Sequence, residues 1–423
     1  MASPEGVVIT GVGIVSPIGT GRADFWAALR RGQSGIRRIE AFDTSSLPVR
    51  IAGEVDGFRA KDYVSRPKQL KLMCRDAQLG VAAAELARRD AGITNGQVDP
   101  DRFGVVLGAD RICAPLEESQ ATYRGCMIDG QFRFQRWGSE GMAATYPLSF
   151  LKLLPNMIAS HISIAYDARG PNNTIHQAEV SSLIAVSEAA RVIRRGSADV
   201  MLAGGASSEM DPFDCVRRCV MGILSHRQDD PAAVMRPFDA DRDGQVWGEG
   251  AAVLVLESRR HAEARKANIL ARLLGWGTTC EPRNGNRRLQ GTGLRRAMVA
   301  ALRRAKLDAH RIGHVNAHGL STVGDDALEA KVIHDLTPEA PVLAPKSYFG
   351  NAGAAGGAME LTTSILALGA RLVPATLNYE RADPNCPLQV VHHAPLCSVH
   401  EPAMVLNWTA IGQSAAVVVA GPN

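Results

Sequence analysis

The chain has 423 residues, which is enough for a sizeable core and, on length alone, for two or three domains. Apolar residues make up 46% and charged residues 21% of the sequence, the balance of an ordinary globular protein. The net charge of +4 is too small to favour a nucleic-acid-binding protein, and aromatic residues, at 5%, are too sparse for a surface that stacks on bases.

Targeting and metal signals are weak. The N-terminus, MASPEGVVITGVG, has no basic region and its apolar run is broken by glycines, so we do not interpret it as a signal peptide. No window approaches the roughly 20 apolar residues that a membrane span requires. The eight cysteines follow no repeating spacing, and no second pair completes a zinc set with Cys215 and Cys219. We therefore expect free thiols, no bound metal or cofactor, and a cytoplasmic location.

Strand and helix patterns alternate through the first part of the chain. The expected elements are a strand at 7–10 with a tight turn at 11–13, helices at 24–31 and 73–86, a strand at 103–108, a long surface or interface loop at 114–147, a helix ending at 164, and a strand at 251–256.

The same alternation returns after a charged helical seam at 261–266. The expected elements are a strand at 269–277, a helix at 293–305, a strand at 314–318 that ends in a glycine turn, a helix at 325–336, an extended segment at 341–345, a Gly/Ala-rich helix at 353–368 and two short strands within 403–420. This order predicts an α/β protein with mostly parallel sheets and two halves, residues 1–258 and 259–423.

The central stretch, residues 165–210, has the clearest pattern. A loop punctuated by Gly170 and Pro171 leads into a helix that begins at Ser181 and stops near Gly196, and a buried strand ends at Gly204. The unpaired N–H groups at the start of this helix face the residue in the preceding turn, which is Glu179.

This stretch resembles the active-site segment of the β-ketoacyl synthases, the condensing enzymes of fatty-acid and polyketide assembly. The resemblance extends over nearly the whole chain, through ITGVGIVSPIG (9–19), RPFDADRDG (236–244), WGEGAAVLVLE (247–257), NAHGLST (316–322), KSYFGNAGAAG (346–356) and NWTAIGQSA (407–415). It implies the thiolase-like fold, in which two related halves pack as five layers, α-β-α-β-α, and two helices that begin at the active site meet at the centre.

The resemblance also implies site residues, and two of them depart from the family. The family's nucleophilic cysteine lies four residues before the leucine of SSL, so Glu179 holds its place. His318 matches the first catalytic histidine, Lys346 the lysine and Glu329 the carboxylate, while Asn351 replaces the second histidine. We therefore predict that the chain alone cannot perform the acyl-cysteine condensation.

The family's substrate arrives on the phosphopantetheine arm of acyl carrier protein. Thr322 remains where the family holds this arm, although Leu320 replaces another threonine. Ile411 replaces the gating phenylalanine of the last loop and is followed by Gly412. A basic cluster, Arg66, Lys68, Lys71 and Arg75, lies where relatives dock the acidic carrier protein, but it is also compatible with a solvated helix face.

Two roles are open for Glu179. It could be a structural plug whose charge satisfies the helix end and pairs with a protonated His318. Alternatively, burial could raise its pKa so that it acts as a general acid or base.

These roles give three hypotheses for the function. The first is a non-condensing partner of an intact ketosynthase, similar to a chain-length factor. The second is an enzyme that uses Glu179 and His318 for elimination, isomerisation, hydrolysis or decarboxylation of acyl thioesters. The third is an acyl-binding homodimer.

Overall fold

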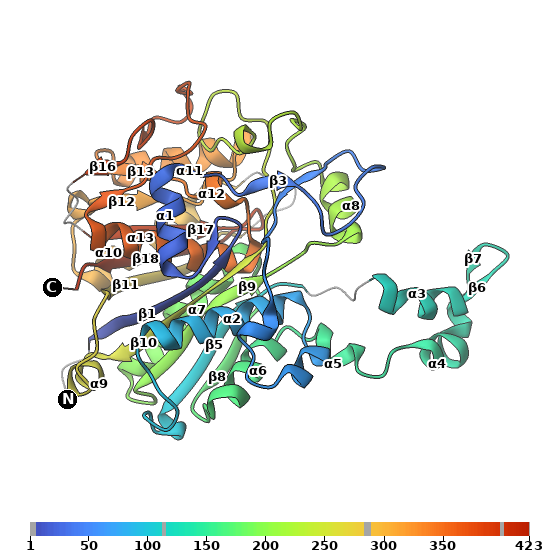
Figure 1. Cartoon of the computed structure of the whole chain (residues 1–423). Helices are drawn as coiled ribbons and strands as arrows, with labels where there is room; N and C mark the ends of the chain where they lie inside the picture. Colours follow the sequence, from blue (N-terminus) through green and yellow to red (C-terminus); the bar gives the residue numbers. More distant parts are fainter. Residues whose placement is uncertain (1–5, 112–115, 283–288, 398–401, 423) are drawn as a thin grey trace.

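Two halves of the chain build one continuous sheet. The computed structural model describes residues 6–111, 116–282, 289–397 and 402–422. Within these residues the sheet has twelve strands, and β1 (Val7–Ser16) joins the two halves by pairing with β11 (Ala271–Cys280) over three residue pairs (Figure 1).

The pairing pattern of the first half is repeated in the second. In the first half β5 pairs in parallel with both β8 and β9, whereas β10 pairs antiparallel with both β9 and β1. In the second half β13, β12 and β17 are parallel, whereas β17, β18 and β11 are antiparallel. The bounds are β5 (Phe103–Ala109), β8 (Asn172–Ile175), β9 (Val200–Ser207), β10 (Gly250–Ser258), β12 (His314–Asn316), β13 (Pro341–Leu343), β15 (Gln389–Val390), β17 (Ala403–Trp408) and β18 (Gln413–Ala420).

The first strand of each half, β1 or β11, contains glycines on which a helix packs directly. The expected tight turn at 11–13 is wrong, because β1 runs straight through it. A Cβ on Gly13 would lie 1.9 Å from the carbonyl oxygen of Ala83, and a Cβ on Gly277 would lie 2.0 Å from that of Ala297. Each glycine therefore lets a helix lie directly on its strand, and each strand has a register shift just before its glycine pair.

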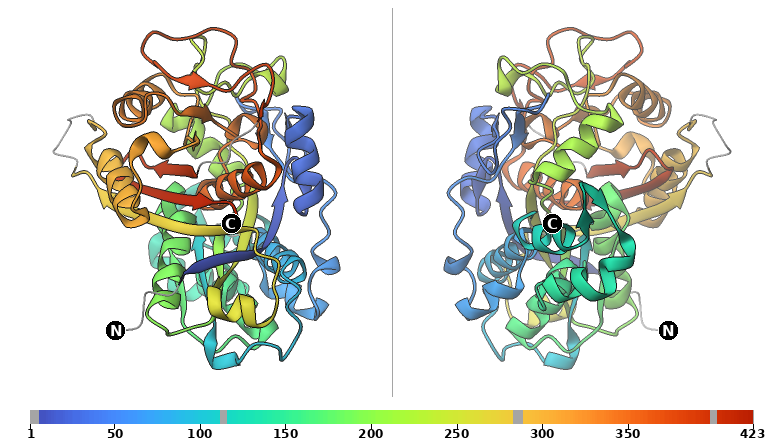
Figure 2. Two further views of the ribbon diagram at one scale, coloured as in Figure 1. Left: turned by 90° about the vertical axis from the view of Figure 1, so that its left-hand side faces the viewer. Right: turned by 90° about the vertical axis from the view of Figure 1, so that its right-hand side faces the viewer.

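Helices complete the five layers that the resemblance implies, and Figure 2 shows the molecule from two further sides. Helices α2 and α6 cover the first half of the sheet, α10 covers β11 and β18 of the second, and α7 and α13 contact each other between the halves. The bounds are α1 (Arg22–Arg31), α2 (Arg75–Asp90), α6 (Met157–Tyr166), α7 (Ser181–Arg194), α8 (Pro212–Met221), α9 (Arg259–Ala264), α10 (Thr292–Ala305), α11 (Val323–Leu336), α12 (Lys346–Phe349) and α13 (Gly356–Ala370).

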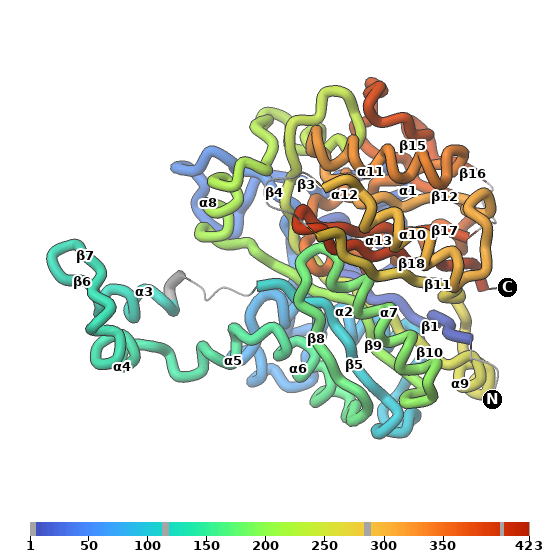
Figure 3. Tube along the Cα trace, turned by 180° about the vertical axis from the view of Figure 1, so that it is seen from behind, coloured from blue at the N-terminus to red at the C-terminus, as the bar shows by residue number. Residues whose placement is uncertain are grey.

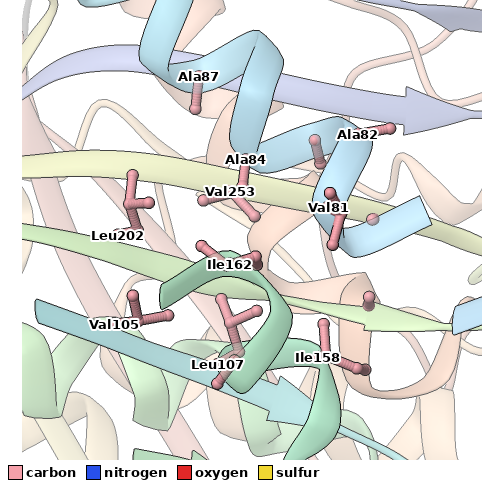
Figure 4. Close-up of a cluster of buried hydrophobic side chains, with 14 of the residues drawn as sticks. Val81, Ala82, Ala84, Ala87, Val105, Leu107, Ile158, Ile162, Leu202 and Val253 are labelled. Atoms are coloured by element: carbon pink, nitrogen blue, oxygen red, sulfur yellow. The ribbon is translucent and has the colours of Figure 1, made fainter. Parts of the chain in front are cut away.

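The outer helices bury aliphatic faces against the sheet. In the first half Val81 and Ala84 of α2 and Ile158 of α6 pack over Val105 and Leu202 (Figure 4). Because α2 is rich in alanine on this side, it can approach the sheet closely, which is also what Gly11 and Gly13 permit.

An arm projects from this body between β5 and α6 (Figures 1 and 3). It contains α3 (Leu116–Gly125), the hairpin of β6 (Met127–Ile128) and β7 (Gln131–Phe132), α4 (Met142–Ala144) and α5 (Ser149–Leu153). The expected loop over 114–147 is thus partly helical in its described part. Sequence periodicity misses these helices because the segment does not pack on the chain's own core.

Other short elements complete the chain. They are β2 (Gly19–Thr20), β3 (Ile36–Arg38), β4 (Ile51–Gly53), β14 (Leu372–Val373) and β16 (Leu396–Cys397). Within the described residues, no helix has the length and apolar character needed to span a bilayer.

Candidate active site

The site begins at the sharp turn between β8 and α7. Residues Ala178–Val180 form a single 3-10 turn in which Ala178 has a φ of +48°, a left-handed conformation that costs free energy for a residue with a side chain. The turn is held by Ser181, whose hydroxyl donates to the Ala178 carbonyl at 2.7 Å and accepts from the Gln177 N–H at 2.8 Å. This turn presents Glu179 at the start of α7.

Glu179 lies among charged groups. Desolvation raises the pKa of its carboxyl, its own backbone N–H opposes the rise, and the nearby Asp110 adds to it. The positive charges of Arg218 and Lys346 also favour the ionised form. The residue keeps part of its surface accessible, so the site is not sealed over it.

His318 is fixed in one neutral form. Its Nδ1 lies 2.9 Å from the Lys346 Nζ and 3.2 Å from the Asn407 Nδ2, and both of these groups are donors. Nδ1 therefore accepts, and the single proton of the neutral ring lies on Nε2. Burial and the Lys346 charge lower the pKa of His318 well below its ordinary value.

The free atom of His318 is consequently a hydrogen-bond donor. Nε2 is buried and has no partner among the described residues. No hydrogen bond joins it to Glu179 in the described part of the chain. A neutral imidazole cannot form the salt bridge with Glu179 that the sequence suggested as one possibility.

Lys346 is held by a carboxylate that the sequence analysis missed. Its ammonium group pairs with Glu360 and donates to the His318 carbonyl at 2.8 Å. Asn407 also donates to Glu360, so Lys346, Glu360, Asn407 and His318 form one buried network. The sequence could have indicated Glu360, because it is the only charged residue of helix α13, whose other residues are apolar or small.

Glu329 holds the backbone at His318. Its carboxylate accepts the backbone N–H of His318 at 2.7 Å and that of Gly319 at 2.8 Å. Burial raises its pKa to about 7. Glu329 thus fixes the backbone that carries the histidine, while Lys346 fixes the ring.

Asn351 is fully engaged in the loop before α13. Its Nδ2 donates to the Gln245 Oε1 at 2.7 Å, and its Oδ1 accepts the Gly353 N–H at 3.3 Å. Its backbone pairs with Val246 and Gly248. The side chain is therefore a buried structural link between this loop and residues 245–248, with no ionisable group.

A second charged network, which includes Arg218, lies near Glu179 and was also missed. Arg218 of α8 pairs with Glu209, and its guanidinium lies 5.5 Å from the ring centre of Trp247. Arg217 bridges Glu209 and Asp214. Desolvation raises the pKa of Glu209, and Arg218 opposes the rise. Arg218 therefore supplies positive charge near Glu179 from a network that also includes Glu209.

No cysteine replaces the missing nucleophile among the described residues. Burial raises the pKa of Cys74, Cys215 and Cys386 to about 12, so these thiols stay protonated at neutral pH. None of the described cysteines hydrogen bonds to Glu179 or His318, and all of them are free. Cys113 lies outside the described residues.

The three residues expected at the carrier arm lie on two segments, just before α11 and in the turn between β17 and β18. Thr322 precedes α11 and donates to Asp325 at 2.8 Å, and Ile411 is 58% exposed. Gly412 has a φ of +100°, and its N–H donates a hydrogen bond to the Thr409 carbonyl of the same turn at 2.9 Å. A cavity of about 920 Å³ lies between the start of α11 and the wall formed by Trp408 and Ala410. Trp408, which lines this cavity, also packs edge-on against His318, so one residue contacts both the cavity and the imidazole.

The expected basic cluster loses one member. Arg66, Lys68 and Lys71 lie exposed on the 3-10 turn Pro67–Leu72 and its flank. Arg75, by contrast, donates to both oxygens of the buried Glu249, at 2.8 and 3.1 Å. It is therefore a structural residue that anchors α2, and the sequence could not show this because Glu249 is 174 positions away.

Comparisons with known proteins agree over almost the whole chain. Residues 4–262 match the family model "Beta-ketoacyl synthase, N-terminal domain", and residues 270–380 match "Beta-ketoacyl synthase, C-terminal domain". The chain is 35% identical to 3-oxoacyl-[acyl-carrier-protein] synthase 2 of Vibrio cholerae, over 92% of each chain.

Solved structures show the same architecture. The ishigamide ketosynthase/chain length factor superposes with a TM-score of 0.87 at 29% identity, over 100% of both chains. A type II PKS acyl-carrier protein in complex with its ketosynthase bound to the hexaketide gives a TM-score of 0.84 at 26% identity, over 99% of this chain and 100% of that chain. The thiolase-like fold expected from the motifs is therefore confirmed.

Proposed function

Because the chain belongs to the β-ketoacyl synthase family, we propose that it is a non-condensing ketosynthase subunit of fatty-acid or polyketide biosynthesis. It works with chains bound to acyl carrier protein and pairs with an intact ketosynthase. The observation that carries the proposal is Glu179 in the turn where the family places its nucleophile, with no reactive thiol beside it in the described residues.

The chemistry of the site supports binding without acyl transfer. Attack by the Glu179 carboxylate on a thioester would give a mixed anhydride, which is more reactive than the thioester, so the transfer would run uphill. His318 presents an N–H donor at Nε2 and cannot accept a proton there. Asn351 has no ionisable group. The site can hold a thioester carbonyl by a hydrogen bond but lacks the groups that would break the thioester.

The arm supports the presence of a partner chain. Its described residues include ten large apolar side chains that are at least 37% exposed: Tyr123, Met127, Ile128, Phe132, Phe134, Met142, Tyr146, Leu148, Phe150 and Leu151. Such a concentration on a segment that stands away from the body is unstable in water unless another surface covers it. β8, at the edge of the sheet beside α6, adds unpaired backbone groups. A second chain of the same fold would cover the apolar side chains of the arm and pair with the backbone of β8.

The carrier protein is the partner that brings the substrate. Arg66, Lys68 and Lys71 form an exposed positive cluster that fits an acidic protein. The cavity between the start of α11 and Trp408 gives room for the arm next to the residue that packs on His318. Thr322, Ile411 and Gly412 are the residues that we assign to the phosphopantetheine arm.

Reconstitution tests the proposal. The chain, an intact ketosynthase, and their mixture would each receive acyl and malonyl carrier protein, and condensed product would be measured. We expect product from the mixture, none from this chain alone, and an undiminished yield when Glu179→Gln replaces the wild type. Product formed by this chain alone, or a mixture that behaves like the ketosynthase alone, would refute the proposal.

One observation favours the second candidate, an enzyme that uses Glu179 as an acid or base. The pKa of Glu179 is raised, and the Nε2–H of His318 could bind a thioester carbonyl at the same time. In that case Glu179→Gln would abolish turnover of an acyl thioester by the isolated chain. The third candidate, an acyl-binding homodimer, would show neither turnover nor dependence on a second ketosynthase.

A further inference from the structure

A second cavity lies at the opposite end of α7 from Glu179. Its volume is about 620 Å³ and it is lined by Arg194 at the end of α7 and by one face of α10: Arg295, Arg296, Val299, Ala300, Arg303 and Arg304. Because α7 has 14 residues, this cavity is about 20 Å from the turn that carries Glu179. It is therefore separate from the candidate active site.

The positive charges of this cavity are not neutralised. No acidic residue lines it. The side chains of Arg295 and Arg303 form no hydrogen bond or ion pair within the described part of the chain, and Arg296 donates only to the Cys280 carbonyl, at 2.8 Å. The five arginines lie exposed around one open recess, where their mutual repulsion is screened by solvent, and a bound anion would relieve what remains.

The repulsion between the arginines affects the pKa of Arg304. Burial and the neighbouring charges of Arg191, Arg194 and Arg303 lower the pKa of its guanidinium. Arg304 is nevertheless held in place, since it donates to the Trp276 carbonyl and lies 4.7 Å from the Trp276 ring centre. Arg194 lies 5.5 Å from the same ring. Two of the cationic groups are thus fixed by one buried indole.

The arrangement suits adjacent phosphate groups. Arg295 and Arg296 lie two turns before Arg303 and Arg304 on α10, so two arginine pairs face the cavity from its ends. Val299 and Ala300 lie between the pairs and give an apolar floor. Guanidinium groups bind phosphate in a bidentate manner, and the volume is in the range of small-molecule sites.

We propose that this cavity, between the end of α7 and the exposed face of α10, binds a soluble ligand with several linked phosphate groups, such as a nucleoside triphosphate. The two arginine pairs hold the phosphates, and Val299 and Ala300 contact the organic part of the ligand. The site does not depend on the function assigned to Glu179.

Calorimetric titration of the full chain tests this site. The probes are ATP, inorganic triphosphate and AMP. We expect ATP and triphosphate to bind, AMP to bind much more weakly, and the affinity to fall as salt is raised. ATP should bind more tightly than triphosphate because only ATP has a group for the apolar floor.

Arg295→Gln combined with Arg303→Gln should weaken ATP binding by about tenfold or more, since two charge-assisted contacts are lost. These side chains have no partner in the described residues, so the variant should fold normally. The matched control, Arg30→Gln combined with Arg38→Gln, changes two exposed arginines elsewhere and should bind like the wild type.

Tryptophan fluorescence gives an independent readout. Arg194 and Arg304 flank Trp276, so ATP should change the emission, and Trp276→Phe should remove that change. The proposal is overturned if ATP and triphosphate give no binding signal, or if both double variants lose affinity equally. Binding of apo acyl carrier protein at this face, without binding of triphosphate, would also overturn it.

Discussion

Lys346 is a buried ammonium group that connects the histidine of the site to the central helix. It is 1% exposed and contacts His318 and Glu360 at once. A buried ion pair of this kind adds little net stability compared with an apolar pair, but the loss of one partner leaves the other charge uncompensated. Its value here is that it fixes the ring of His318.

Lys346→Met is therefore expected to lower the free energy of unfolding by about 3–5 kcal/mol. Combining it with Glu360→Gln should cost less than the sum of the two single changes, because the two residues share one interaction. Urea denaturation would measure these values, with Lys61→Met, at an exposed lysine, as the control. Additive losses would contradict the pairing.

Asp76 gives the fold a pH dependence. It is 3% exposed, accepts the Ser208 N–H at 2.7 Å, and desolvation raises its pKa to about 7. The folded state therefore keeps a proton that the unfolded state has already lost between about pH 4 and pH 7. Stability must fall as the pH rises through this window.

We expect the wild type to lose about 2 kcal/mol more than Asp76→Asn between pH 5 and pH 7.5, because asparagine keeps the acceptor without the titration. Denaturant titrations at both pH values would show it. Asp335→Asn, at an exposed position, should follow the wild type. Parallel curves for wild type and Asp76→Asn would show that Asp76 is ionised in the folded state.

At the level of elements, α7 and α13 approach each other closely because small residues lie between them. Ser182 accepts the Ala358 N–H at 3.0 Å, and a Cβ on Gly357 would lie 2.3 Å from the Asn407 Oδ1 and 2.7 Å from the Leu183 Cγ. The same contact therefore packs the two halves and positions Asn407, which faces His318.

Gly357→Ala should lower the free energy of unfolding by about 1–3 kcal/mol through overpacking. Gly369→Ala is the matched control in the same helix, because a Cβ there meets nothing within 4 Å. It should be neutral or slightly stabilising. Equal effects of the two changes in thermal or chemical denaturation would contradict close packing at Gly357.

The elements differ in how well the sequence predicts them. Long periodic helices such as α7 and α10 and buried strands such as β9 are predicted well, because their apolar pattern is set by the core. β8 is missed, since Asn172, Asn173 and Thr174 show no apolar alternation and pair only through backbone groups at an edge. The arm is predicted as a loop because its apolar residues face away from this chain.

The site is predictable only where a motif carries it. Glu179, His318, Lys346, Glu329 and Asn351 are assigned from the family motifs. In the structure Lys346 and Glu329 bond to His318, whereas no hydrogen bond among the described residues links Glu179 or Asn351 to it. Glu360 and Arg218 lie outside every motif that we identified, and Asn407 and Glu209 lie inside motifs that assigned them no role. They are found only through tertiary contacts, such as that between Asn407 and His318 over 89 positions.

For the whole molecule, we expect the arm to determine the assembly state. Phe134 and Phe150 are 72% and 67% exposed on it. We expect the purified wild-type chain to self-associate or to form a stable complex with an intact ketosynthase, and Phe134→Glu with Phe150→Glu to prevent both.

Sedimentation velocity and co-purification would measure this assembly. Val323→Glu, at a 62% exposed residue on α11 away from the arm, is the control and should assemble like the wild type. A wild-type chain that stays monomeric and does not bind a ketosynthase would contradict a partner role for the arm.

The absence of a nucleophile at residue 179 is tested most directly by intact mass spectrometry. The wild-type chain, the Glu179→Cys variant and an intact ketosynthase would each be incubated with acyl carrier protein that carries an acyl chain, and their masses would then be measured. We predict an unmodified mass for the wild type and an added acyl group on the ketosynthase and on Glu179→Cys, whose thiol would lie at the N-terminus of α7. An acyl group bound covalently to the wild-type chain would contradict a non-condensing subunit.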